Sequence, residues 1–251
     1  MVVKSGSMRF CVCIKQVPDV NAPVHTGRMV LNAYDASAVE EAIVLKEGHG
    51  GAVDLVLLGP ASATETIRKA LAMGSDDAFH IVHDRPETLD SFAVATVLAR
   101  FFETRDYDVI ACGKQSQDTD AGLTGPMLAE LLGLPYASNA VRLQIEDGRL
   151  VVTRQGDSGP EVLLLDAPCL VTCSNDMNDP RIPNLRGIMA ARKKSIDTIP
   201  AAELVAEVSS RSVVLRIEDP PPREPGTMLD GDPEEMASEL VRRLETEAKV
   251  I

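Results

Sequence analysis

The sequence predicts an α/β fold in which helices cover both faces of a mostly parallel sheet and antiparallel strands extend that sheet. Through the first half, short apolar runs rich in β-branched residues alternate with segments of helical periodicity. This alternation is typical of parallel sheets with crossover helices. After Pro135, strand-like runs instead flank Asp147-Gly148, a dipeptide that favours hairpins. With 45% hydrophobic and 25% charged residues, the 251-residue chain has the composition of a globular protein.

The first half divides into four strand–helix pairs. Asp35 is expected to cap the first helix and Gly48 to end it, and Gly74 is expected to end the second. The expected strands are residues 8–15, 53–59, 78–83 and 107–113, and the expected helices are residues 35–48, 61–74, 90–105 and 119–133.

The second half is expected to be less regular. Residues 137–155 predict a hairpin and residues 159–173 a further extended segment, whereas residues 174–200 lack periodicity and predict a long loop. Residues 211–217 read as a strand, a proline-rich stretch follows, and residues 233–251 predict an amphipathic helix. We therefore expect one domain over residues 8–200, with a loop at 173–195, and a C-terminal arm with its helix over residues 201–251.

Composition excludes several classes of function. A net charge of −13 disfavours nucleic acid and anionic membranes as partners, and the aromatic content of 3% disfavours base stacking. The chain has no apolar run long enough to enter a membrane, and its five cysteines lack disulfide or metal spacing. The short polar N-terminus does not resemble a secretory signal, so we expect a cytoplasmic protein. No triad or metal motif is present, and we expect neither catalytic residues nor a metal site.

The loop over residues 113–127 is a candidate anion site. Its glycines permit close backbone approach, and the start of the following helix offers free N–H groups. The loop contains no Walker or dinucleotide fingerprint, so a plain capped strand–helix loop stays an equal alternative. Asp118 and Asp120 would repel phosphate, and we expect them to cap the helix or bind hydroxyls.

Two further segments lie where ligands of such sheets bind. Lys15 ends the first strand, as part of a ligand site or as a solvated strand end. Residues 32–35 precede the first helix, either as an N-cap with a packed Tyr34 or as an aromatic edge facing a ligand. Cys11 and Cys13 share a strand face, which favours apolar packing over metal binding.

The segment 173–194 combines apolar residues with a basic run. Leu185, Ile188 and Met189 are interspersed with arginines and lysines. An apolar tip ringed by charge suits docking to a protein, although a solvated surface loop is the simpler alternative.

Taken together, these segments resemble the beta subunit of electron transfer flavoprotein. The resemblance rests on motifs in family order over nearly the whole chain: CVCIKQVPD (11–19), AVEEAIVLKE (38–47), GPASATETIRKALAMGSDDAFHI (59–81), GKQSQDTDAGLTGPMLAELLGLP (113–135), VTRQGDSGPEVLLLDAPCLVT (152–172) and DPRIPNLRGIMAARKK (179–194).

The resemblance implies an adenine nucleotide α-hydrolase-like fold and a heterodimer with an alpha subunit that holds most of the FAD. It implies an electron carrier that takes electrons from flavin-dependent dehydrogenases and passes them to a quinone reductase or another acceptor. The arm over residues 201–251 would wrap the alpha subunit. The nucleotide contacts of this subunit would fall on Cys13, Asn32, Ala33, Tyr34, Asp35, Leu58, Thr119, Asp120, Ala121, Gly122, Leu123, Thr124, Gly125, Pro126 and Met127.

The nucleotide itself would be AMP or, in an electron-bifurcating relative that oxidises NADH, a second FAD. Thr124-Gly125 resembles AMP binders, whereas Pro126 and the early KQVPD (15–19) resemble the bifurcating branch, and we favour AMP slightly. A stand-alone nucleotide-binding regulatory protein is the alternative outside the family. The docking residues implied are Arg181, Leu185, Ile188, Met189 and Lys193.

Overall fold

The computed structural model describes residues 8–22, 26–207, 209–216, 218, 221–222 and 225–250. The chain forms two compact units, Met1–Val213 and Val214–Ile251. The first unit contains both hydrophobic clusters of the protein's core. Among the described residues, no helix combines the length and the apolar character that crossing a membrane requires.

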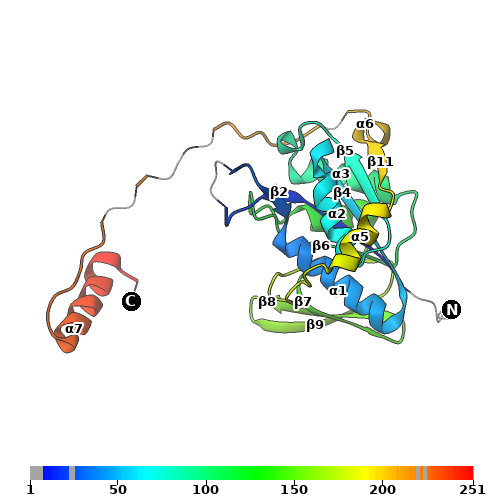
Figure 1. Ribbon diagram of the computed structural model, residues 1–251. Coiled ribbons are helices and arrows are strands. Elements are labelled where there is room, and N and C mark those ends of the chain that lie inside the picture. The colour runs from blue at the N-terminus through cyan, green and yellow to red at the C-terminus, as the bar shows by residue number, and fades with distance from the viewer. Residues whose placement is uncertain are drawn as a thin grey trace. The chain divides into compact units, whose positions relative to one another are not determined.

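One nine-stranded sheet organises the first unit, in the order β11-β5-β4-β1-β6-β10-β7-β8-β9 (Figure 1). Neighbouring strands from β11 to β7 are parallel, whereas β8 is antiparallel to both β7 and β9. This confirms the predicted fold class. The strands are β1 (Met8–Ile14), β4 (Gly51–Gly59), β5 (Ala78–Val82), β6 (Val109–Gly113), β7 (Tyr136–Glu146), β8 (Arg149–Gly156), β9 (Gly159–Leu165), β10 (Cys169–Cys173) and β11 (Asp197–Pro200).

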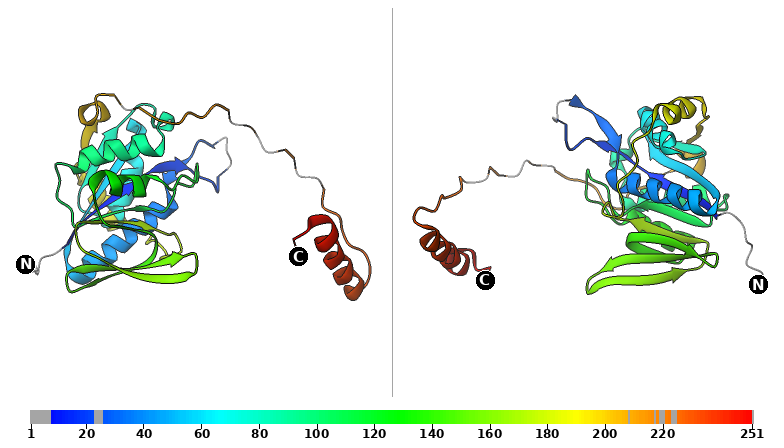
Figure 2. Two further views of the ribbon diagram at one scale, coloured as in Figure 1. Left: turned by 180° about the vertical axis from the view of Figure 1, so that it is seen from behind. Right: turned by 60° about the horizontal axis from the view of Figure 1, so that its bottom comes forward.

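Helices cover both faces of this sheet. One cluster packs α1 (Ala33–His49) and α2 (Thr64–Met73) on one face, and the other packs α3 (Ser91–Phe102), α4 (Thr124–Leu132) and α6 (Ala201–Leu204) on the opposite face (Figures 1 and 2). The helix α5 (Leu185–Lys193) lies against α2. Short 3-10 turns occupy η2 (Ala61–Ala63) and η3 (Pro86–Thr88).

The central strand β1 shows why the core has two sides. Phe10, Val12 and Ile14 belong to the first cluster, whereas Cys11 and Cys13 belong to the second. The predicted apolar packing of the two cysteines is therefore confirmed. Burial raises the pKa of both thiols, which keeps them in the unreactive protonated form.

The hairpin prediction is also confirmed. Asp147 and Gly148 join β7 to β8, both with positive φ values of 50° and 74°. Such angles are what a two-residue hairpin turn requires, and their backbone twist matches that of the flanking strands.

Two expectations are wrong, and one element was not expected. Residues 174–200 contain α5, capped by the Asn184 side chain, and β11, which pairs with β5. Residues 211–216 form no strand, and residue 217 lies outside the described residues. The small sheet of β2 (Gln16–Pro18) and β3 (Met29–Leu31) was not expected.

The second unit contains one helix, α7 (Pro233–Arg243), which continues as the π-helical turn η4 (Leu244–Ala248). Asp232 begins α7 with a capping box that includes Glu235, and none of its residues is buried. The predicted C-terminal helix is confirmed in its main part.

Candidate functional site

The predicted contact residues gather where the strand order reverses. From β1 the chain proceeds outward through β4 and β5, then returns to place β6 on the other side of β1. In open parallel sheets this reversal leaves a crevice beyond the carboxyl ends of the two central strands. The loops after Ile14 and Gly113 lie at this point of the sheet edge.

Asp35 links the ends of the two central strands. Its Oδ2 accepts a hydrogen bond from the Lys15 amide at 2.7 Å, and its Oδ1 accepts one from the Gly113 amide at 2.9 Å. The expectation that Asp35 caps α1 is wrong, because α1 begins two residues earlier with Asn32 at its N-cap position. Burial raises the pKa of Asp35 to about 7.

Asn32 fixes the loop that follows β6. Its Nδ2 donates to the Gln115 carbonyl at 2.9 Å, and its Oδ1 accepts from the Gln117 amide at 3.1 Å. The Ala33 amide in turn donates to Gln117 Oε1 at 3.0 Å. The segments 32–35 and 113–117 are therefore joined by a continuous set of hydrogen bonds. Gln115 and Gln117 were not singled out in the sequence, because glutamines next to a glycine loop carry no local signal.

The acidic residues of the loop are engaged within the protein. Asp118 accepts two hydrogen bonds of 2.8 Å from Lys15 Nζ, and Asp120 accepts one of 3.0 Å from Gln115 Nε2. Asp120 has a φ of 51°, in the left-handed region. Neither carboxylate caps α4, so the capping alternative is wrong for both. The Lys15 charge is already balanced by Asp118 and is not a free phosphate ligand.

The beginning of α4 suits an anionic group. Leu123 occupies its N-cap position and makes no side-chain capping hydrogen bond, and Pro126 in the first turn carries no N–H group, so Thr124 and Gly125 supply the first-turn N–H donors. Those N–H groups carry the positive end of the helix dipole. Ser116 and Thr119 add two hydroxyl groups, 2.9 Å apart, to the same loop.

Gly113 and Gly125 lie against the protein's own atoms. A methyl group at Gly113 would overlap the Asp35 carboxylate and approach the Tyr34 Cβ. One at Gly125 would lie 2.6 Å from Thr172 Cγ2 and 2.8 Å from Cys112 Sγ. Both glycines therefore have a packing reason, which is independent of any ligand.

The other predicted contacts lie around this crevice at different depths. Cys13 is buried beside Cys112 in the register of β1 and β6, and Leu58 is near the end of β4, partly buried. Met127 packs against the second core cluster, whereas Leu123 is 59% exposed. Exposed or half-buried positions complete the loop: Thr119, Asp120, Ala121, Gly122, Thr124 and Pro126.

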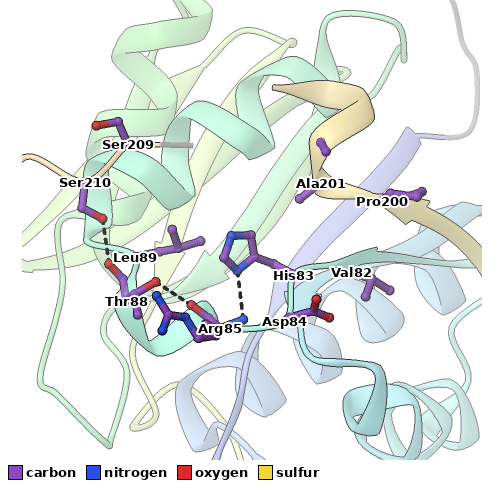
Figure 3. Close-up of a pocket in the computed structure, with 11 residues that line it drawn as sticks. Val82, His83, Asp84, Arg85, Thr88, Leu89, Pro200, Ala201, Ser209 and Ser210 are labelled. Atoms are coloured by element: carbon purple, nitrogen blue, oxygen red, sulfur yellow. Dashed lines mark hydrogen bonds between the residues drawn. The ribbon is translucent and has the colours of Figure 1, made fainter. Parts of the chain in front are cut away.

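Two cavities lie away from all these residues. One, of about 700 Å³, opens at the carboxyl end of β5, where His83, Arg85, Thr88 and Ser210 are among the lining residues (Figure 3). The other, of about 490 Å³, is lined by Arg9, Tyr107 and Pro168 among others. The first shares the sheet edge of the crevice but lies two strands from β1.

The predicted docking residues form a separate surface on α5. Leu185 is 76% exposed, Met189 49% and Ile188 38%. Lys193 is exposed as well, whereas Arg181 is engaged: its guanidinium contacts Glu40 at 2.8 Å and Glu47 at 2.7 Å on α1. Arg181 therefore attaches the segment to α1, a role that the sequence could not reveal because the partners are distant along the chain.

The cysteine thiols offer little nucleophilic chemistry. All five cysteines are free and buried, and burial raises the pKa of each thiol. No group of three or more histidine, cysteine or acidic side chains suitable for a metal occurs within the described ranges. The crevice can instead bind and orient a ligand through backbone and hydroxyl groups.

Comparison with known proteins identifies relatives along most of the chain. A family model described as "Electron transfer flavoprotein domain" matches residues 23–204. The electron transfer flavoprotein subunit beta of Bacillus subtilis is 36% identical over 226 residues, covering 88% of both chains. The subunit of the same name from Bradyrhizobium diazoefficiens is 37% identical over 257 residues, covering 97% of this chain and all of its own. The caffeyl-CoA reductase-Etf complex subunit CarD of Acetobacterium woodii is 34% identical over 256 residues, covering 94% of this chain and 98% of its own.

Proposed function

The chain belongs to the electron transfer flavoprotein family, and from that premise we propose that it is the beta subunit of a heterodimeric electron carrier. The observation that carries the proposal is the likeness to named beta subunits over 88 to 97% of this chain. Such a subunit accepts electrons, through its alpha subunit, from flavin-dependent dehydrogenases and delivers them to a quinone reductase or another acceptor.

Within this carrier, the crevice at the ends of β1 and β6 holds an adenine nucleotide, AMP in our proposal. The uncapped start of α4 and the hydroxyls of Ser116 and Thr119 would receive its phosphate, and the segment 32–35 would border the adenosine. The residues fit an anionic group that is bound rather than transformed, because the two nearby carboxylates are occupied by Lys15 and Gln115.

Redox chemistry would come from FAD when bound, and this chain's residues would bind, orient and exclude water. We propose no acid–base or nucleophilic step for them. The surface of Leu185, Ile188 and Met189 would dock the dehydrogenases, because apolar side chains at this exposure gain free energy when a partner covers them.

Nucleotide analysis of the purified heterodimer tests the proposal. We expect denaturation to release one FAD and one AMP per heterodimer. Two FAD and no AMP would instead establish the bifurcating alternative, in which a second flavin oxidises NADH. A homodimer that binds ATP reversibly and forms no complex with an alpha subunit would favour the regulatory alternative and overturn the proposal.

The docking role has its own test. Leu185→Ala should weaken electron delivery from a dehydrogenase while leaving the melting temperature of the heterodimer and its nucleotide content unchanged, because the side chain is 76% exposed. A clear fall in melting temperature with unchanged electron delivery would contradict the docking role.

A further inference from the structure

We propose that Arg68 on α2 and Lys194 at the end of α5 make a reciprocal contact that fixes the position of the docking surface formed by Leu185, Ile188 and Met189. The inference rests on the proposed docking function and deepens it by naming positioning residues outside that surface. Neither Arg68 nor Lys194 belongs to the docking surface.

Each of the two residues donates hydrogen bonds to backbone carbonyl groups at or just beyond the end of the other helix. Arg68, on α2, donates from Nη1 to the carbonyl oxygens of Ala191 at 2.6 Å and Lys194 at 2.5 Å, at the end of α5. Lys194 donates from Nζ to the carbonyls of Ser75 at 2.5 Å and Asp76 at 2.8 Å, just beyond α2. Helix ends leave carbonyls without partners, and a cation there is favoured by the helix dipole. Arg68 therefore supplies a cation at the end of α5, and Lys194 attaches that same end to the turn after α2.

The contact between the helices is also close. A methyl group at Gly187 would overlap the Ala72 carbonyl oxygen on α2. The absence of a side chain at this position is thus what allows α5 to lie directly on α2, with Ala191 buried in the first core cluster.

The beginning of α5 is held by an ion cluster and a capping hydrogen bond. Arg181 pairs with Glu40 and Glu47 on α1, and Asn184 Oδ1 accepts the Gly187 amide at 2.9 Å. Both ends of the helix are therefore attached to the folded core. A partner that docks on Leu185 would meet an ordered helix, so that binding does not include the entropic cost of ordering it.

Hydrogen exchange and steady-state kinetics on the heterodimer test this inference. Arg68→Gln and Lys194→Met should speed amide exchange over residues 185–193 about tenfold, the equivalent of about 1.4 kcal/mol, with the sheet unchanged. With a flavin dehydrogenase that reduces the wild-type complex, KM should rise about tenfold and kcat should stay within about twofold. Arg68→Lys keeps a cation at this position, so its amide exchange and its KM should lie closer to the wild-type values than those of Arg68→Gln. The matched control is Lys69→Gln, an exposed neighbour on α2, which should change neither quantity.

Gly187→Ala tests the position of α5 on α2 separately from the helical order of α5. Alanine favours helix over glycine, so α5 should stay protected from exchange while its displacement from α2 still raises KM. Unchanged exchange in Arg68→Gln and Lys194→Met, an unchanged KM despite faster exchange, or an equal KM rise in Lys69→Gln would each overturn the inference. If no dehydrogenase reduces the wild-type complex, the proposed function fails, whereas the exchange measurement still decides whether the two residues hold α5.

Discussion

At the scale of single residues, Asp35 shows what a sequence motif can and cannot predict. The sequence placed Asp35 near the first helix start and the ligand edge, which is where it lies. Its partners, the amides of Lys15 and Gly113, come from two other segments, and only the assembled sheet brings them to 2.7 and 2.9 Å. A capping rule considers only residues that are close in the sequence, so it could not predict these hydrogen bonds to distant segments.

The Asp35 carboxyl should make stability depend on pH. Burial raises its pKa from 3.8 to about 7, so between these values the folded state holds a proton that the unfolded state has released. Stability should therefore fall as pH rises through this range. We expect the melting temperature of the wild-type protein to decline from pH 5 to pH 8, and Asp35→Asn to reduce the slope. An equal slope in this variant would contradict the assignment.

Asp90 supplies the control for that experiment. Its carboxylate accepts hydrogen bonds from the amides of Ala93, Arg211 and Ser212, and these hydrogen bonds lower its pKa despite the opposing effect of burial. Its contribution is present above the ordinary pKa of an aspartate and is lost only in more acidic solution. Asp90→Asn should lower the melting temperature by a similar amount from pH 5 to pH 8, without changing the slope.

Gly125 gives a second prediction at this scale. Gly125→Ala should destabilise the protein by about 1–3 kcal/mol, because the new methyl group overlaps Thr172 Cγ2 and Cys112 Sγ. Adding Thr172→Ser removes one of these atoms and keeps the hydroxyl that accepts the Asn139 amide, so it should restore part of the loss in thermal unfolding. Nucleotide content measured in both variants then separates packing from ligand contact. A nucleotide loss that persists in the double variant supports direct approach of the backbone to the ligand.

At the scale of elements, the segment before α5 is attached to α1 by an ion cluster. Arg181 contacts Glu40, whose side chain is only 9% exposed. Arg181→Met should lower the free energy of unfolding by about 1–3 kcal/mol, because it leaves this carboxylate buried without its partner. Adding Glu40→Gln should recover part of the loss in denaturant unfolding, since the uncompensated charge is removed. A double variant no more stable than Arg181→Met would contradict this explanation.

The elements that the sequence predicted well are those with a strong local period. The four strand–helix pairs and the β7–β8 hairpin follow from residue patterns alone. Helix α5 was missed because it spans only nine residues and its close contacts with the core are a glycine and an alanine, Gly187 and Ala191. Its apolar residues Leu185, Ile188 and Met189 do have helical spacing, but they are exposed, and in the sequence we interpreted them as a docking surface instead. The strand β11 was missed because its four residues acquire their structure only by pairing with β5. Conversely, the apolar run at 211–216 has no neighbouring strand in the described sheet and stays irregular.

At the scale of the whole molecule, the two units differ in what stabilises them. The first unit contains both core clusters, whereas α7 in the second has no buried residue. On α7, the side chains of Leu240 and Val241 are 49% and 50% exposed. Its capping box and the Arg242–Glu239 ion pair support the helix locally, but a helix of this length gains most of its stability from packing. We therefore expect the alpha subunit to cover the apolar side chains of α7.

Truncation after Val213 tests this expectation. The shortened chain should keep the melting temperature of the first unit, because no core residue is removed, and should bind the alpha subunit more weakly in sedimentation or size-exclusion experiments. Leu240→Asp in the full chain should weaken the complex in the same direction, because a charge would replace an apolar side chain in the contact. The matched control is Glu245→Gln in η4, an exposed polar exchange that should leave binding unchanged. If the truncated chain binds the alpha subunit as tightly as the full chain, the arm has no part in the heterodimer and its helix must have another partner.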